Sequence, residues 1–159
     1  MTRYHVECNP EEALLLTFGT PRSDITHHSG SGTVIKTLSE NSQLIGLIDE
    51  DPERIANHPY YRQCYNNPTF DQNNIRCSID ANRNNKMIFI KPRFEPWIIE
   101  VARKAKLTLS DFNLNDDANK LHAEINSKRS DLQKLLHKLI ADKNNTILQL
   151  RNHLMNDLL

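Results

Sequence analysis

The 159-residue sequence contains little glycine, an odd number of cysteines and no excess of either charge. Four glycines are too few for a chain built mainly of loops or of many short strands joined by tight turns. Cys8, Cys64 and Cys77 include no CxxC pair, so we expect free thiols rather than a disulfide framework or a zinc knuckle. Twenty basic residues balance twenty acidic ones, so no overall positive field indicates a nucleic-acid partner, although a neutral protein can carry a local basic patch.

Long apolar runs are also missing. No run approaches the 18 residues that a membrane-spanning helix needs, so we expect no membrane partner. The N-terminal stretch "MTRYHVECNPEEALLL" is too polar for a signal peptide, which makes the cytoplasm the expected location. The length is sufficient for one domain with a substantial core.

Strand and helix patterns alternate in the first third of the chain. We expect a strand at 4–8, a helix at 9–19 with Asn9 as its N-cap, a short extended piece and a Gly/Ser turn within 23–32, a helix at 33–42 and a buried strand at 43–51. This β-α-β-α-β order favours a mainly parallel sheet covered by helices.

The rest of the chain continues as two strands and then mostly helix. Residues 52–74 begin as a helical turn and are interrupted by Pro59 and Pro68. The expected elements after them are strands at 75–80 and 86–92 joined by a turn, a helix at 93–107, and three helices within 117–159 with breaks at Ser130-Asp131 and Asn144-Asn145. The predicted fold class is therefore α/β, with a core over residues 1–110 and a C-terminal helical extension over 111–159 packed on that core.

Three acids follow predicted strands, two of them in "LIGLIDEDPERI" at residues 44–55. Asp49 and Asp51 are two residues apart, so on a strand their side chains point the same way, and Glu7 ends the first strand. Ligand sites of parallel sheets lie at the carboxyl ends of strands, and carboxylate oxygens suit Mg²⁺. The alternative interpretation is structural: Asp51 caps the next helix, Pro52 occupies its first position, and Glu7 is an ordinary exposed acid.

The order of these motifs resembles the topoisomerase–primase (Toprim) domain over about residues 3 to 107. That family has a Glu after its first strand and a DxD motif after a later one, which correspond here to Glu7 and to Asp49-Glu50-Asp51. The chain is more narrowly similar to the small Toprim-like proteins related to the overcoming-lysogenisation-defect (OLD) nucleases, through "HHSGSGTVIK" and the acid–aromatic segment "RFEPWII". Cys8 stands where the family usually has Gly, and Thr33 stands where a Lys is often found.

The resemblance implies a metal-dependent nuclease in which Glu7, Asp49 and Asp51 hold Mg²⁺ or Mn²⁺. Glu95 joins these three as a candidate catalytic residue, and Glu7 could instead be a general acid or base. The implied partners are nucleic acid (DNA rather than RNA), an ATPase within a defence system, and further copies of the chain. The alternative is a non-catalytic Toprim-fold subunit that binds or regulates a partner protein.

Small and basic residues supply the candidate phosphate contacts. A turn of small residues before a helix presents free N–H groups to an anion, and basic side chains bind phosphate through charge. The candidates are Gly30, Gly32, Lys36, Arg62, Lys91 and Arg93. Structural alternatives stay open here: a plain surface turn at the glycines, packed aromatics around Arg62, and a Glu95 that only stabilises the start of a helix.

Overall fold

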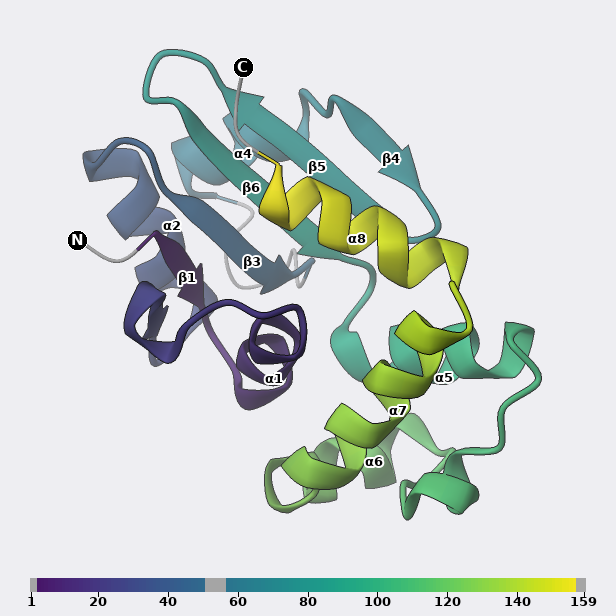
Figure 1. Ribbon diagram of the computed structural model, residues 1–159. Helices are drawn as coiled ribbons and strands as arrows, with labels where there is room; N and C mark the ends of the chain where they lie inside the picture. The colour runs from purple at the N-terminus through teal and green to yellow at the C-terminus, as the bar shows by residue number, and fades with distance from the viewer. Residues whose placement is uncertain (1–2, 51–56, 157–159) are drawn as a thin grey trace.

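The computed structural model of the protein describes residues 3–50 and 57–156 (Figure 1). The strands are β1 (Tyr4–Val6), β2 (Ile25–His27), β3 (Ile45–Asp49), β4 (Phe70–Gln72), β5 (Ile75–Asp80) and β6 (Asn85–Ile90). The α-helices are α1 (Asn9–Thr17), α2 (Ser31–Glu40), α4 (Pro59–Tyr65), α5 (Phe94–Lys104), α6 (Ala118–Glu124), α7 (Arg129–Ala141) and α8 (Asn145–Met155). Three short 3₁₀ turns are η1 (Arg22–Asp24), η2 (Leu109–Phe112) and η3 (Ile125–Ser127).

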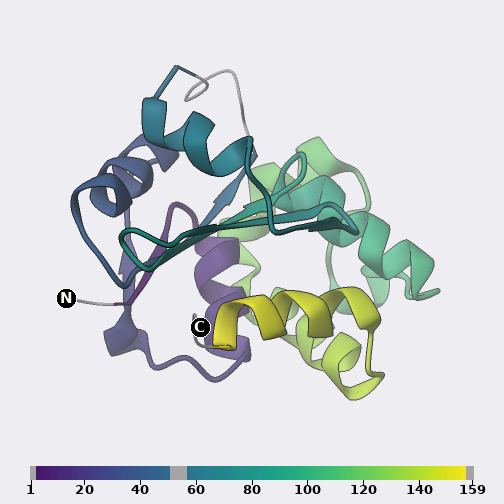
Figure 2. The same ribbon diagram turned by 90° about the horizontal axis from the view of Figure 1, so that it is seen from above.

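The strands form one sheet in the order β2-β1-β3-β6-β5-β4. The first four strands in this order are parallel, and β5 runs antiparallel to both of its neighbours. Helices cover both faces: α2 and α4 lie on one side, and α1 and α8 lie on the other (Figure 2). The predicted α/β class with a mainly parallel sheet, flanking helices and a C-terminal helical extension is confirmed.

Alternation along the strands divides the core into two layers. In β3, Ile45 and Leu47 face the larger cluster, which includes residues of α1, α5, α7 and α8. Ile48, on the opposite face, joins the smaller cluster beneath α2 and α4. Because side chains alternate along a strand, Asp49 continues the Ile45–Leu47 face, which is the face that α1 covers.

Several local features differ from the predictions. Helix α4, which Pro59 begins with His58 as N-cap, was not expected, and proline is well tolerated in the first helical turn. The helical turn predicted from residue 52 falls on 51–56, outside the described residues. The short strand β4 was not expected in its polar surroundings. The break before α7 lies at Lys128, just ahead of the expected Ser130-Asp131, whereas the predicted break at Asn144-Asn145 is confirmed.

Of the three C-terminal helices, α6 packs on α5, α7 on α1 and α8 on the sheet (Figure 2). Leucines of α7 and α8 belong to the same cluster as the apolar residues of β1 and β3. The buried Lys86 of β6 donates from Nζ to the backbone carbonyl of His153 at 2.5 Å, and the Tyr4 hydroxyl donates to that of Leu154 at 3.1 Å. These bonds satisfy carbonyls at the end of α8 that the helix itself leaves free. Within the described residues, no helix is long and apolar enough to cross a membrane.

A buried amide side chain lies at the N-terminal ends of β3 and β6, at the opposite end of these strands from the acids. The Asn85 side chain is almost fully buried and accepts a hydrogen bond from the Leu44 backbone N–H at 2.8 Å. Its Nδ2 lies 2.7 Å from the Leu38 carbonyl and 2.9 Å from the Asn41 carbonyl. One side chain therefore ties the end of α2 to the start of β3 and to β6.

Replacing Asn85 by Ala should destabilise the fold markedly. The change leaves a buried N–H and buried carbonyls unpaired, so we expect a loss of about 2–4 kcal/mol in the free energy of unfolding. Urea denaturation would measure it, with the exposed turn residue Asn82→Ala as a control expected to change stability by less than about 0.5 kcal/mol. Equal stability of the two variants would contradict the assigned role of Asn85.

Candidate metal centre

Two of the predicted acids meet at the carboxyl edge of the sheet. Glu7 directly follows β1 and Asp49 ends β3, and these two strands are adjacent and parallel, with Val6 opposite Leu47. The strand ends therefore bring together carboxylates that are 42 positions apart in the chain. Asp51, the second acid of the DxD motif, lies outside the described residues.

A third acid, Glu11 of α1, completes the cluster and was not among the predicted site residues. One carboxylate oxygen each of Glu7, Glu11 and Asp49 lies within 4.8 Å of the other two. Glu11 is fully buried and Asp49 is 9% exposed. The sequence interpretation placed Glu11 only in the first turn of a helix, where the helix dipole stabilises a negative charge.

The start of α1 explains how Glu11 turns toward the site. The N-cap is Cys8 rather than the predicted Asn9, so Glu11 is the third residue of the helix. Its Oε2 accepts hydrogen bonds from the backbone N–H groups of Glu7 at 2.9 Å and Cys8 at 3.2 Å, which is the reach-back of a capping box. The capping-box spacing was the signal that could have identified it.

The other oxygen of Glu11 has no such bond. Within the described residues, Oε1 is buried and no hydrogen-bond partner reaches it. Its neighbours are satisfied: the Ser31 hydroxyl at the start of α2 donates to Glu7, and the Phe94 N–H at the start of α5 donates to Asp49 Oδ1 at 3.0 Å. A buried carboxylate oxygen without a partner is costly, so it indicates a place for a cation or a water.

Burial and mutual repulsion shift the acids toward their neutral forms. Burial raises the pKa of Asp49 to about 8, with the charges of Glu7 and Glu95 acting in the same direction. Burial also raises the pKa of Glu11 well above its ordinary value, and the charges of Asp49 and Glu7 add to this effect. A divalent cation would reverse the balance, because it favours the ionised carboxylates.

The surroundings of Cys8 favour its neutral thiol over the thiolate. Burial raises the pKa of its thiol strongly, and the negative charges of Glu11 and Asp49 raise it further. The backbone at Cys8 is extended, with φ of −137°, a conformation open to any residue. The absence of glycine at this position therefore leaves the local turn intact.

No protein-family model, curated protein or solved structure matches this chain. The donor set suits Mg²⁺ or Mn²⁺, because it consists of three carboxylates and includes a buried oxygen that no hydrogen-bond partner reaches in the described part of the chain.

The predicted catalytic residue Glu95 lies next to this cluster but not in it. It is the second residue of α5, and its charge contributes to the raised pKa of Asp49. Its Oε1 lies 2.9 Å from Nδ1 of His122 on α6. His122 was missed by the sequence interpretation, since only the packing of α6 against α5 brings the two residues together.

The predicted phosphate contacts occupy different surroundings. Arg93 is the N-cap of α5 and lies close enough to Asp49 for its charge to act against the raised pKa of that acid. Lys91 pairs with Asp71 at 3.0 Å. Arg62 on α4 and Lys36 on α2 are exposed.

The predicted small-residue turn precedes α2 beside Glu7. Gly30 is the N-cap of α2 and Gly32 lies in its first turn, where a Cβ would meet no atom within 4 Å. Ser31 between them directs its hydroxyl to Glu7. The start of α2 therefore borders the acid cluster, although neither glycine is required by close packing.

The aromatic residues around Arg62 serve the structure of the site. Tyr60 and Tyr61 are buried, which agrees with packed aromatics rather than exposed stacking platforms. Tyr61 donates its hydroxyl hydrogen bond to the Glu50 carbonyl at 3.0 Å, and Tyr65 donates to the Glu50 carboxylate at 2.6 Å. These bonds fix the residue that follows Asp49.

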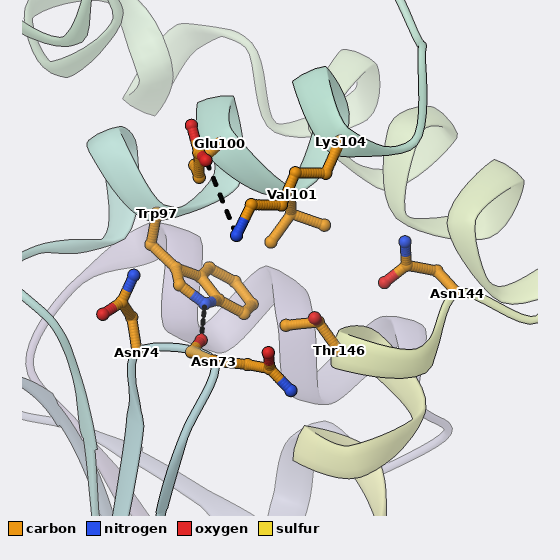
Figure 3. A pocket seen from close by; sticks show the side chains of 8 residues that line it. All are labelled: Asn73, Asn74, Trp97, Glu100, Val101, Lys104, Asn144 and Thr146. Carbon is orange, nitrogen blue, oxygen red and sulfur yellow. Dashed lines mark hydrogen bonds and ion pairs between the residues drawn. The ribbon is translucent and has the colours of Figure 1, made fainter.

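A separate shallow pocket lies beyond the acid cluster, between the β4–β5 turn, α5 and the start of α8 (Figure 3). Trp97 forms part of its wall and donates from Nε1 to the Asn73 carbonyl at 3.3 Å. Glu100 and Lys104 form an ion pair at its rim. None of Glu7, Glu11, Asp49 and Glu95 lines this pocket, so it is not the predicted site.

The raised pKa of Asp49 predicts how the stability of the metal-free protein depends on pH. The pKa is about 8 in the fold and 3.8 is its ordinary value, so between these limits the folded state binds more protons than the unfolded state. The free energy of unfolding should therefore fall as the pH rises from about 4 to about 8. Asp49→Asn should weaken this decline and be about 1–3 kcal/mol more stable than the wild type at pH 8.

Urea unfolding in the presence of a chelator, across this pH range, measures the effect. Asp111→Asn, a change at an exposed acid of η2, is the control and should follow the wild-type curve. A wild type that becomes more stable with rising pH, or an Asp49→Asn variant less stable than the wild type at pH 8, would contradict the burial argument.

Proposed function

We propose that the chain is a Mg²⁺- or Mn²⁺-dependent phosphodiesterase of the Toprim type that cleaves nucleic acid. The observation that carries the proposal is the cluster of Glu7, Glu11 and Asp49 at the ends of two adjacent parallel strands. The buried Oε1 of Glu11 has no hydrogen-bond partner within residues 3–50 and 57–156, and a bound cation would supply one. The family resemblance of the motif order adds the reaction type.

Each residue has a task in such a reaction. A bound divalent cation supplies positive charge that stabilises the charge developing on the phosphoryl group and the leaving oxygen. Glu7, Glu11 and Asp49 hold the cation. The Ser31 hydroxyl and the Phe94 N–H keep two of these carboxylates in one orientation, so the ligands are arranged before the substrate arrives.

The positions of the basic residues support a polyanionic substrate. Arg93 lies at the start of α5 beside the acids, and Arg62 and Lys36 are exposed on α4 and α2. Contacts between such cations and phosphates provide affinity without reading sequence. DNA rather than RNA, an ATPase partner in a defence system, and self-association are the partners that the resemblance adds to the proposal.

The competing function is a non-catalytic Toprim-fold subunit. The observation in its favour is that the turn before α2 has no lysine and that Lys91 is engaged with Asp71. The other departure, Cys8, is accommodated as a helix cap and does not disturb the acids. A subunit that only binds a partner has no need for three mutually repelling carboxylates, two of them buried, so we favour the enzyme.

Glu11→Gln should abolish Mn²⁺-dependent cleavage, with a loss of at least about 100-fold in kcat. Gln keeps the shape and its one oxygen can still accept the capping bonds, but the atom in the place of Oε1 is then an amide NH2, which cannot bind a cation. Nucleic-acid binding should stay within about threefold of the wild type, because affinity comes from the basic residues. The assay should use the wild type, this variant and, as control, Glu100→Gln at a partly exposed acid of α5, with and without proteins encoded beside this chain.

A Glu11→Gln variant that cleaves as fast as Glu100→Gln would contradict the proposed use of the cluster. If the wild type binds nucleic acid or a partner protein and never cleaves under any of these conditions, the non-catalytic function replaces the enzyme.

Arg93→Ala should weaken nucleic-acid binding more than Lys91→Ala. Arg93 stands beside the acids, whereas the Lys91 ammonium is already neutralised by Asp71. Loss of one phosphate contact should lower the slope of the logarithm of affinity against the logarithm of salt by about 1 for Arg93→Ala. Fluorescence anisotropy at several salt concentrations measures this slope, and a larger effect of Lys91→Ala would reverse the assignment.

A further inference from the structure

Glu95 is a fourth acid kept at the edge of the cluster. Its side chain is 5% exposed, and its negative charge contributes to the raised pKa of Asp49. The backbone N–H of the preceding residue, Phe94, binds Asp49 directly. The first turn of α5 therefore presents both a donor and a buried carboxylate to the region of the three-acid cluster.

The side chain that holds Glu95 comes from the helical extension. Nδ1 of His122 on α6 lies 2.9 Å from Oε1 of Glu95. No second side-chain hydrogen bond or ion pair to Glu95 occurs within residues 3–50 and 57–156. The His122 side chain is 65% exposed, so a group at the surface anchors an acid that water hardly reaches.

The packing of α6 fixes His122 in this place. Leu121, the residue before it, is fully buried in the main core, and Ile125 is buried one turn later. The helix begins at the N-cap Asp117, which accepts a hydrogen bond from the Lys120 N–H at 3.0 Å. The contact with Glu95 therefore follows from the seating of α6 on α5 and not from a loose surface side chain.

Two purely structural explanations do not account for the burial of Glu95 and its contact with His122. An acid in the first turn is favoured by the helix dipole, but that effect needs neither burial nor a histidine. Exposed ion pairs contribute little to stability, and a pair made only for stability would not need one partner buried beside other carboxylates. The location of the pair points instead to the chemistry of the neighbouring acids.

We propose that His122 is the positioning residue for Glu95 in the metal-dependent reaction. Its Nδ1–H donates to Oε1 and holds the carboxylate in one orientation beside the acid cluster, where a carboxylate can orient a water or a substrate hydroxyl. The proposal rests on the proposed function of the cluster. It also makes α6, outside the stretch that resembles Toprim domains, a part of the active site.

Cleavage kinetics in Mn²⁺ test the proposal with three variants of the full chain, assayed with any required partner. His122→Ala should lower kcat by about 10–100-fold and change KM by less than about threefold, because it loosens a reacting group and not substrate binding. His122→Asn should retain kcat within about threefold, since its amide can donate to the same oxygen. Lys120→Ala, a change of an exposed cation on the same helix, is the control and should match the wild type.

A second readout needs neither metal nor activity. In the metal-free protein, the ¹³C chemical shift of the Glu95 side-chain carboxyl reports its hydrogen bonding. This signal should move in His122→Ala and stay close to its wild-type position in His122→Asn and Lys120→Ala. Thermal melts of each variant establish that the compared proteins are folded.

The outcomes separate this inference from the proposed function. A wild type that cleaves, together with a His122→Ala variant that cleaves equally well, overturns the inference alone. Equal losses in His122→Ala and His122→Asn also overturn it, because they assign His122 a proton-transfer role that an amide cannot fill. A wild type with no Mn²⁺-dependent cleavage overturns both, whatever the carboxyl signal does.

Discussion

Three carboxylates held together in a largely buried place are the constraint on which this structure depends. Glu7, Glu11 and Asp49 repel one another and lose hydration, and the fold opposes both effects with directed donors. Backbone N–H groups from the starts of α1 and α5 and the Ser31 hydroxyl bind particular oxygens. Oε1 of Glu11 has no hydrogen-bond partner among the described residues. Three clustered carboxylates and an acceptor oxygen without a donor support the proposal that this place binds a cation.

The C-terminal helices contact the elements that carry the acids. α7 packs against α1, the helix that carries Glu11, and Arg129 of α7 pairs with Glu12 at 2.9 Å. α8 is fastened to the sheet by Lys86, which binds the carbonyls at its end. α6 then delivers His122 to Glu95. The C-terminal helices are thus coupled to the acid cluster through α1, which carries Glu11, and α5, whose first N–H group binds Asp49.

The sequence predicted the sheet and the two strand-end acids because both follow from local pattern. An apolar run ending in "DED" placed Asp49 correctly at the carboxyl end of a buried strand. Glu11 was missed because Asn9 was taken as the N-cap, which moved Glu11 out of the capping-box position and away from Glu7. His122 was missed because 27 residues separate it from Glu95, and only tertiary packing joins them. Helix α4 was not expected because a proline gives the same signal whether it interrupts a helix or begins one.

Calorimetric titration of the metal-free protein with Mn²⁺ tests the central claim most directly, since it asks whether the three acids form a cation site before any substrate is known. The account predicts saturable binding by the wild type and an affinity at least about tenfold lower when Glu11 is replaced by Gln, because the carboxylate whose Oε1 lacks a partner among the described residues loses its charge. Heat changes no different from buffer, or equal affinity in the two proteins, would contradict it.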